Sequence, residues 1–396
     1  MSRFSSFVLA LLLLVASGQV MAATYYTAGT AATATTLTLT STNTFVKAAN
    51  WTLATCGLAT RAAISADVTI SNGDTFVVCG SHTLAVTAAT ATVDAGTGKT
   101  ITLQVESTGT VTADSTNKLV FGSTGTGKVI NNGIITLTNT DNVALTLTGT
   151  YTAGTTGVLN STCESVGAGG AWTAAATWGT ATAACGVTVG AGSSPPLPTA
   201  NSAVIIASTT AVTAGTGTVK SLTFKASVAG LLTLSGPLTV GSLATPGNIV
   251  FTGATGSILT ASGQTITLSG NLTTIAATNI AGTTAPNLTL TDADHTLTID
   301  GTTQPITLGT LTLTPPTAST TERTITVGTN GINVTSYSLG ACATAASGTT
   351  ASTFSATAPQ IPAATYYCKL APVVPGVAAP LFSTKEKAAV FSQEVK

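Results

Sequence analysis

The stretch TLTLT at residues 36–40 alternates leucine with threonine. A period of two places successive side chains on opposite faces of a β-strand, so this segment is predicted to bury its leucines and expose its hydroxyls. Threonine is β-branched and favours extended backbone, which supports the same prediction. The alternation recurs in short runs, among them VTI at 68–70, ITLQV at 101–105, IITLT at 134–138, SLTF at 221–224, TITL at 265–268, LTLT at 288–291, TLTID at 296–300, LTLT at 311–314 and TITV at 324–327.

Turn signals separate these runs. The dipeptides Asn72-Gly73, Asn132-Gly133 and Asn330-Gly331 accommodate positive φ angles easily. Short strands at intervals of about 8–12 residues fit either tandem β-sandwiches or one long coil of strands. The shortness of the runs and the 40 glycines favour the coil, in which each rung buries its aliphatic face on the next. The sequence therefore predicts an all-β solenoid, with tandem sandwiches as the alternative.

Two segments resemble each other and are interpreted as the starts of two modules. In each, a tryptophan is followed by a cysteine and then by two strand-like runs: Trp51 with Cys56, and Trp178 with Cys185. We predict a first solenoid module at residues 24–157 and a second at residues 158–335.

The end of the chain differs in composition. Residues 336–380 contain two cysteines and a proline-rich stretch, which suits an extended or edge-covering segment. In residues 381–396, Ser383 and Glu386 form a capping-box pattern ahead of Phe391 and Val395, which share a helical face. A short terminal helix or tail is predicted, either loosely attached or capping the solenoid.

The first 23 residues have the pattern of a cleaved export signal, with an uncleaved anchor as the alternative. Arg3 gives a positive start, residues 7–16 are apolar, and small residues surround Met21. Ten apolar residues are too few to span a bilayer, and no later run is long enough. We expect a secreted or cell-surface protein with no membrane span in the mature chain.

Charge is scarce. Charged residues make up 7% of the chain, 13 basic and 13 acidic, against about 25% in typical soluble domains. Loss of Arg3 with the signal leaves 12 basic side chains. Such a surface has no basic field to attract nucleic acid and little repulsion between copies, so self-association or contact with other surface or matrix proteins is expected. Because 44% of the residues are hydrophobic, the low charge does not indicate disorder.

The cysteines are even in number and fall into three local pairs. Fifteen pairings are formally possible, and the simplest joins neighbours 23, 22 and 26 residues apart. Each bond would contribute about 3 kcal/mol in the chain-entropy model. The predicted structural disulfides are Cys56–Cys79, Cys163–Cys185 and Cys342–Cys368, with free or intermolecular thiols as the alternative.

Most of the chain resembles a known family in the pattern of its strand-like runs. AWTAAATW at 171–178 is followed by SSPPLPTANSAVII at 193–206, TVKSLTF at 218–224, LLTLSGPLTVG at 231–241 and GNIVFTG at 247–253. This order resembles the rungs of secreted bacterial right-handed parallel β-helix proteins of the pectin-lyase-like and adhesin-passenger type. The resemblance is one of pattern and implies an elongated exported protein, without implying an activity. The chain lacks the terminal amphipathic strands of an autotransporter.

Two stretches come close to a phosphate-binding loop. In GSTGTGKV at 122–129, Val129 stands where a magnesium-binding hydroxyl is needed, and in VDAGTGKT at 93–100, Val93 replaces the first glycine. A strand rather than a helix is expected after each, so no helix N-terminus would face a phosphate. We expect turns and no nucleotide or other cofactor.

Ionisable groups concentrate only at TDADHTLTIDG, residues 291–301. Asp292 and Asp294 are a weak candidate calcium site, and on adjacent rungs of a polysaccharide-active enzyme such carboxylates could act as acid and base. Aspartate is equally typical of turns, and no Lys or Arg lies within twenty residues to stabilise an anion. His82 and His295 are the only histidines. We predict turns here and no catalytic residues.

Trp51, Trp172 and Trp178 could stack on sugar rings beside a threonine-rich face. They lie near cysteines at the module starts, where packing over the open end of a coil is the other explanation. The preferred hypothesis is a non-enzymatic, self-associating or fibre-forming structural protein of the surface or matrix. The alternatives are an adhesin-like glycan-binding protein and, less favoured, a polysaccharide lyase or hydrolase.

Overall fold

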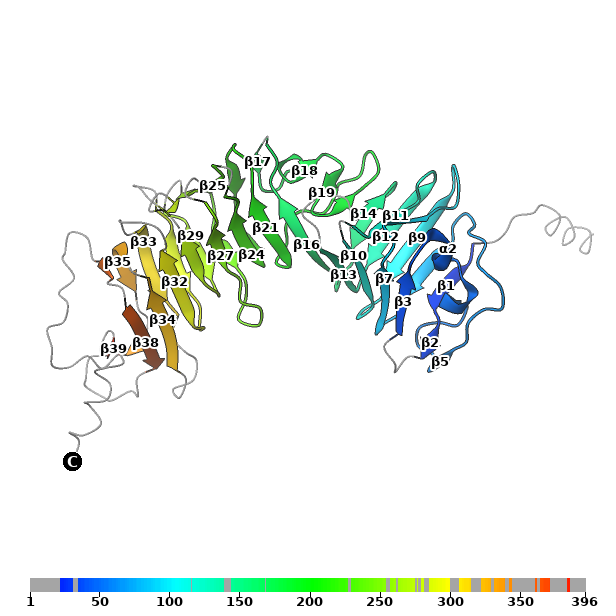
Figure 1. The fold of residues 1–396 in the computed structure, drawn as a ribbon, viewed down its shortest axis with the longest axis horizontal. Helices are drawn as coiled ribbons and strands as arrows, with labels where there is room; N and C mark the ends of the chain where they lie inside the picture. The colour runs from blue at the N-terminus through cyan, green and yellow to red at the C-terminus, as the bar shows by residue number, and fades with distance from the viewer. Residues whose placement is uncertain are drawn as a thin grey trace, which may run out of the picture. The chain divides into compact units, whose positions relative to one another are not determined.

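The computed structural model describes residues 22–30, 35–114, 116–138, 144–167, 169–226, 229–253, 257–260, 263–274, 276, 279–280, 285–299, 306–314, 322–328, 331–338, 342–343, 360–361, 364–370 and 383–384. The protein is all-β, and its long sheets consist mainly of parallel strands (Figure 1). It divides into two compact units: Met1–Asn160 with Gly186–Pro195, and Ser161–Cys185 with Pro196–Lys396. The division falls within strand β16 (Val158–Glu164).

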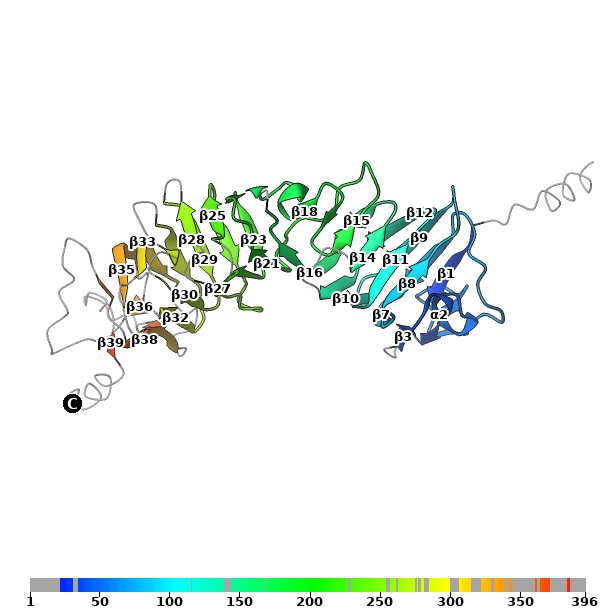
Figure 2. The ribbon, with the colours of Figure 1, turned by 45° about the horizontal axis from the view of Figure 1, so that its top comes forward.

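In the first unit, consecutive strands enter three sheets in rotation over residues 75–138, where each strand pairs in parallel with the one three places later. Figure 2 shows β8, β11 and β14 of one sheet side by side. The first sheet contains β1 (Thr24–Thr27), β6 (Thr75–Val78), β9 (Thr100–Val105), β12 (Thr126–Asn131) and β15 (Tyr151–Ala153). The second contains β3 (Thr35–Leu39), β7 (His82–Val86), β10 (Thr110–Asp114), β13 (Ile134–Thr138) and the start of β16. The third contains β8 (Thr90–Val93), β11 (Lys118–Phe121), β14 (Leu145–Leu147) and β20 (Val187–Thr188).

The second unit repeats this rotation over residues 202–274, and after that the strands of the described residues alternate between two sheets. One sheet contains the end of β16, β21 (Ser202–Ile206), β24 (Ser221–Phe224), β27 (Ile249–Phe251), β30 (Leu272–Thr274), β32 (His295–Ile299) and β34 (Glu322–Val327). Another contains β17 (Gly170–Ala171), β22 (Val212–Ala214), β25 (Leu231–Leu234) and β28 (Ser257–Thr260). The last contains β23 (Gly217–Val219), β26 (Leu238–Val240), β29 (Thr265–Leu268), β31 (Asn287–Leu290), β33 (Ile306–Leu313) and β35 (Ile332–Ser338). Rotation among three parallel sheets is compatible with a β-solenoid.

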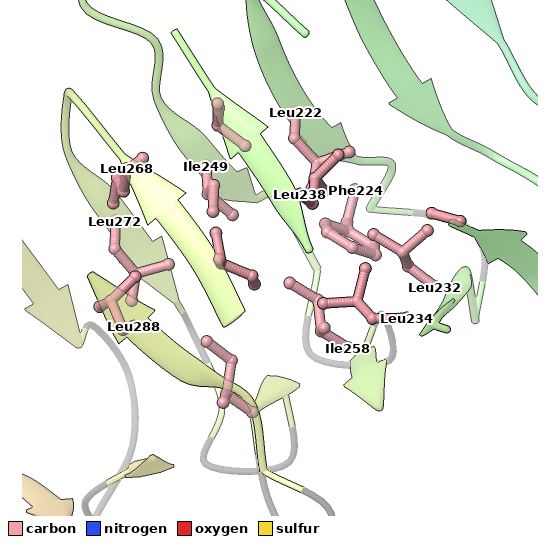
Figure 3. Packing of buried hydrophobic residues seen from close by; sticks show 14 of the residues in the cluster. Leu222, Phe224, Leu232, Leu234, Leu238, Ile249, Ile258, Leu268, Leu272 and Leu288 are labelled. Carbon is pink, nitrogen blue, oxygen red and sulfur yellow. The ribbon is translucent and has the colours of Figure 1, made fainter. Parts of the chain in front are cut away.

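The core of each unit is built from aliphatic ladders. In the second unit, Leu222 is in register with Ile249, and Ile249 with Leu272. These side chains point inward between the sheets (Figure 3), where Phe224 and Phe251 stack with ring centroids 4.2 Å apart. The alternation that predicted the strands thus sorts the side chains, with leucine, isoleucine and valine inside. Burying one such side chain contributes about 1.5–3 kcal/mol.

Antiparallel strands close several sheets. β4 (Trp51–Thr52) pairs with β1 in the first unit, whereas β37 (Gln360–Ile361) pairs with β35 and β38 (Ala364–Leu370) with β34 in the second. β36 (Cys342–Ala343) and β39 (Ser383–Thr384) then pair with β38. The predicted extended segment at 336–380 therefore includes short strands. Residues 385–396 lie outside the described residues, so the terminal helix stays a prediction, and Ser383 belongs to a strand.

The short helix α2 (Thr42–Phe45) and the 3-10 turn η1 (Ala48–Asn50) interrupt the strands near the start. The prediction of a strand at VTI, residues 68–70, is wrong, since these residues lie in a loop. Val68 is buried in the core of the first unit, and its amide donates to the Val46 carbonyl just after α2, so the end of the helix rather than a sheet holds this segment. None of the helices in the described residues has the length and apolar character to cross a membrane.

Candidate functional site

An aromatic cap begins the first unit. Phe45, at the end of α2, is fully buried against Trp51, Phe76 and Phe121, with the first two ring centroids 5.0 and 4.8 Å away. The Trp51 indole N–H donates to the Phe45 carbonyl. The 3-10 turn η1 lies between Phe45 and Trp51, so these two rings come from one short segment. Both rings pack on Phe76 of β6, in the first sheet of the unit.

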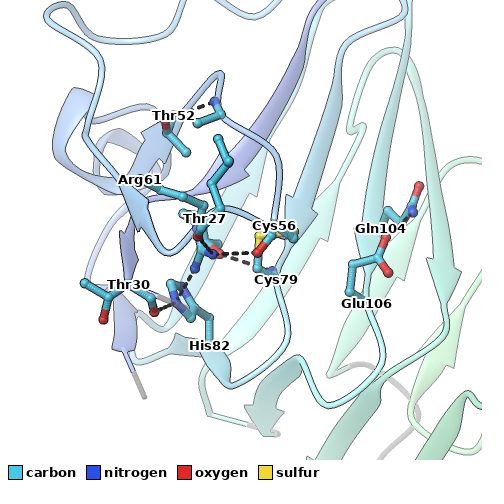
Figure 4. The surroundings of a disulfide bond; sticks show 11 residues. Thr27, Thr30, Thr52, Cys56, Arg61, Cys79, His82, Gln104 and Glu106 are labelled. Atoms are coloured by element: carbon cyan, nitrogen blue, oxygen red, sulfur yellow. Dashed lines mark hydrogen bonds between the residues drawn. A yellow bond between two sulfur atoms is a disulfide. The ribbon is translucent and has the colours of Figure 1, made fainter. Parts of the chain in front are cut away.

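A disulfide and a buried arginine hold the loop after this cap (Figure 4). Cys56 is bonded to Cys79, with Cα atoms 5.3 Å apart. The Arg61 guanidinium donates to the Thr27 carbonyl at 3.0 Å and to the Cys56 and Leu58 carbonyls at 2.8 and 3.3 Å. These backbone contacts satisfy a cation that is only 2% exposed.

The second unit has a related cap. Trp172 and Trp178 pack edge to face with centroids 4.8 Å apart, and the Trp178 indole donates to the Trp172 carbonyl at 2.7 Å. The turn η2 (Ala175–Thr177) lies between them, as η1 does before Trp51. Cys163 is bonded to Cys185. In both units, the indole N–H of a tryptophan thus donates to the backbone carbonyl of an aromatic residue six positions earlier.

The three tryptophans are buried. Trp51 and Trp178 are 0% exposed and Trp172 is 8% exposed. Their rings therefore present no open face to a sugar, and the expectation of glycan contacts through them is corrected to packing within the caps. Two of the three predicted disulfides are present. The side chains of Cys342 and Cys368 lie outside the described residues, so the third disulfide stays a prediction.

The two phosphate-loop-like stretches are strand–turn–strand segments. VDAGTGKT joins β8 to β9, and GSTGTGKV joins β11 to β12. The Asp94 carboxylate accepts from the amides of Gly96, Thr124 and Gly125 at 3.3, 2.9 and 3.1 Å. These amides, which a phosphate would need, are occupied by the chain's own carboxylate. Gly127 has no room for a side chain, since a Cβ there would meet the Phe121 carbonyl.

The same contacts set the titration of Asp94. Burial raises its pKa, but hydrogen bonds from Thr124, Gly96 and Gly125 outweigh this and hold the pKa at about 2. Since the pKa is below its ordinary value of 3.8, the carboxylate stabilises the fold above pH 3.8, and this contribution is lost as the pH falls towards 2.

Asp94→Asn is therefore expected to destabilise the first unit by about 1–2 kcal/mol at pH 7, because an amide accepts fewer and weaker hydrogen bonds. Urea unfolding followed by circular dichroism at pH 7 and pH 2.5 measures this. The difference between variant and wild type should shrink at the lower pH. A difference that is independent of pH would show that the charge of Asp94 does not contribute.

The acidic cluster of the second unit lies in a turn. Asp292 and Asp294 fall between β31 and β32, and Asp300 lies outside the described residues. His295 is 2% exposed, with Nδ1 2.6 Å from the Gly270 carbonyl and Nε2 3.0 Å from that of Thr291. Within the described residues, no three His, Cys, Asp or Glu side chains come together as a metal site. His295 is held as a structural bridge between turns.

Outward-facing threonines form a ladder on one sheet of the second unit. They are consecutive register partners on β23, β26, β29, β31 and β33, namely Thr218, Thr239, Thr267, Thr289 and Thr312. Parallel strands place such side chains about 4.8 Å apart. None of these five strands contains a charged residue. The result is a neutral, hydroxyl-bearing strip that sequence alternation predicted only strand by strand.

The edge of the second sheet in the first unit is formed by β3. Among the described strands, β3 pairs with β7 and is the last member of this sheet. Its sequence TTLTL contains no Lys, Glu or Pro, the residues that commonly protect edge strands. Thr36 and Thr38 are exposed, and Leu37 and Leu39 are buried.

Comparison with known proteins found no matching family, no similar curated protein and no similar solved structure.

Proposed function

We propose that this chain is a secreted right-handed parallel β-helix that serves as structural material of the cell surface or extracellular matrix by associating with copies of itself. The observation that carries the proposal is β3, which ends its sheet among the described strands and contains no Lys, Glu or Pro. Such an edge is suited to pair with a strand of a neighbouring copy. The near-zero net charge adds little repulsion between copies.

Other observations support export and a structural role. The disulfides suit an oxidising compartment. The aliphatic ladders are inside, and the outward threonines give a neutral surface. The buried histidines and the self-satisfied Asp94 serve the fold, which supports a non-enzymatic role. In this proposal the caps close each unit over its own core, and β3 provides the contact between copies.

Electron microscopy of the purified mature protein tests this function. Wild type is expected to form regular filaments or sheets, and Thr38→Lys, which places a charge on the edge strand, should reduce them. Thr112→Lys is the matched control, because Thr112 lies in the same row two strands further in. Monodisperse single copies of the wild type over a wide concentration range would overturn the proposal, as would equal loss in both variants.

A second candidate, glycan binding, is favoured by the threonine ladder alone. Its hydroxyls repeat at a step close to that of an extended glycan, and the strip carries no charge. A glycan array with wild type and a Thr239→Val, Thr267→Val variant tests it. Binding that the variant loses would support this function, and absence of binding to every neutral glycan would exclude it.

A further inference from the structure

Two buried basic side chains, Arg61 and His82, touch where the loop after the aromatic cap of the first unit is held. Arg61 Nη2 lies 2.7 Å from His82 Nε2, and the residues are 2% and 0% exposed. The same His82 Nε2 lies 3.2 Å from the Thr30 carbonyl oxygen. His82 Nδ1 and Thr30 Oγ1 are buried without a hydrogen-bond partner among the described residues. Figure 4 shows the His82 ring between Arg61 and Thr30.

One nitrogen cannot make both contacts as hydrogen bonds. Arg61 can only donate, so Nε2 must accept from it, and the proton of the neutral ring is then on Nδ1. A carbonyl can only accept, so a bond to Thr30 requires a proton on Nε2. The two bonds therefore exclude each other, and protonation of the ring exchanges the first for the second.

We propose that His82 is an acid-sensitive latch: the neutral ring accepts from Arg61 and holds the loop at residues 53–60 against β1, whereas the protonated ring donates to the Thr30 carbonyl instead, loses the bond from Arg61 and releases the loop. Arg61 is the connection, because its Nη1 binds the Cys56 and Leu58 carbonyls of that loop. The Cys56–Cys79 disulfide keeps the released loop tethered.

The charges around the ring favour this direction. Arg61 is the charged side chain in contact with His82 among the described residues, and the neighbouring cysteines are disulfide-bonded. Residues 31–34, which follow Thr30, are AATA and contain no titratable group. Burial lowers the pKa of His82, the Thr30 carbonyl opposes this, and Arg61 lowers the pKa further. The closed latch, in which Arg61 donates to His82, is therefore fully stabilised above pH 6.5 and weakens as the pH falls below it.

The loop carries an apolar surface. Leu53 and Leu58 are 63% and 52% exposed. Releasing the loop would free Leu53 and Leu58 to contact another apolar surface. Resting on the proposed self-association, this places assembly under the control of pH, with a second copy of the chain as the partner of the released loop.

Nitrogen NMR of the wild type labelled at histidine tests the latch without altering it. The chain contains two histidines, so a His295→Gln sample assigns the signals. At pH 8, His82 is expected to carry its proton on Nδ1. A proton on Nε2 at this pH would overturn the proposal.

Hydrogen exchange at low protein concentration tests the release. Between pH 7.5 and 5, after correction for intrinsic rates, amides of residues 53–61 should lose at least about tenfold protection, the effect of losing one hydrogen bond from a charged group. His82→Gln should lose none, because its oxygen can accept from Arg61 while its nitrogen donates to Thr30. His295→Gln should behave as wild type. An equal change in all three proteins, or none in the wild type, would contradict the latch.

Light scattering at high concentration then separates the two proposals. Acid-enhanced assembly of wild type but not of His82→Gln supports both. If the loop is released in acid but the protein does not assemble, the latch stands and the proposed self-association is contradicted. Assembly that is equal at both pH values overturns the regulatory role of the latch and leaves self-association intact.

Discussion

Trp51→Ala is expected to lower the free energy of unfolding of the first unit by about 3–5 kcal/mol. Its side chain is fully buried and packs on Phe45 and Phe76 at centroid distances of 5.0 Å. The cavity lies where the cap seals the core, so both packing and the indole hydrogen bond are lost. Urea unfolding followed by far-ultraviolet circular dichroism measures the change.

Two variants divide this effect. Trp51→Phe keeps an aromatic ring and loses the N–H bond to the Phe45 carbonyl. It should therefore retain more than half of the stability that Trp51→Ala loses. Leu53→Ala, two residues further on and 63% exposed, should change stability by at most about 0.5 kcal/mol. If Trp51→Ala were as stable as Leu53→Ala, the aromatic cap would not be closing the core.

The double variant Cys56→Ala, Cys79→Ala removes the disulfide that holds the loop after this cap. It should lower the free energy of unfolding by about 2–4 kcal/mol. The bond closes a loop with a sequence separation of 23 residues, and its loss frees the unfolded chain and loosens the loop bound by Arg61. The urea midpoint of the double variant, compared with that of oxidised wild type, measures the cost.

The other disulfide is a matched comparison. Cys163–Cys185 has a separation of 22 residues, so chain entropy predicts a nearly equal effect in the second unit. A much larger effect at Cys56–Cys79 would indicate that the Arg61 contacts depend on the bond. No effect at either position would contradict the stabilising role of both. Mass spectrometry of an unreduced digest would show whether Cys342 and Cys368 also pair.

Sequence alternation predicted the strands because each rung obeys the same local rule: Leu37 and Leu39 are buried and Thr36 and Thr38 are exposed, as TLTLT indicates. Equal spacing predicted Cys56–Cys79 and Cys163–Cys185 because these bonds close short loops. The order of the sheets and the threonine ladder required the register, which depends on partners some 20 to 30 residues away and not on any one run.

The caps were predicted least well. A four-residue helix gives too little periodicity to be found, and VTI at 68–70 has a strand pattern although Val68 lies in a loop and its amide donates to the Val46 carbonyl just after that helix. The position of Trp51 near Cys56 suggested packing, but nothing in the sequence pairs Arg61 with His82, 21 residues later. The one available signal was an arginine in a loop whose nearest acid, Asp67, is six residues away and pairs with Lys47 instead. Its partners are backbone carbonyls, which every sequence possesses.

Cysteine cross-linking across the threonine ladder tests the parallel stacking of rungs on which the account depends. Thr239 and Thr267 are register partners, so their cysteine variants should lie about 4.8 Å apart and form a disulfide readily. Thr239 and Thr289 are two strands apart, about 9.6 Å, beyond the reach of a disulfide. Parallel stacking in this register predicts efficient cross-linking of Thr239→Cys with Thr267→Cys and none of Thr239→Cys with Thr289→Cys. Equal cross-linking of both pairs, or cross-linking of the second alone, would contradict it.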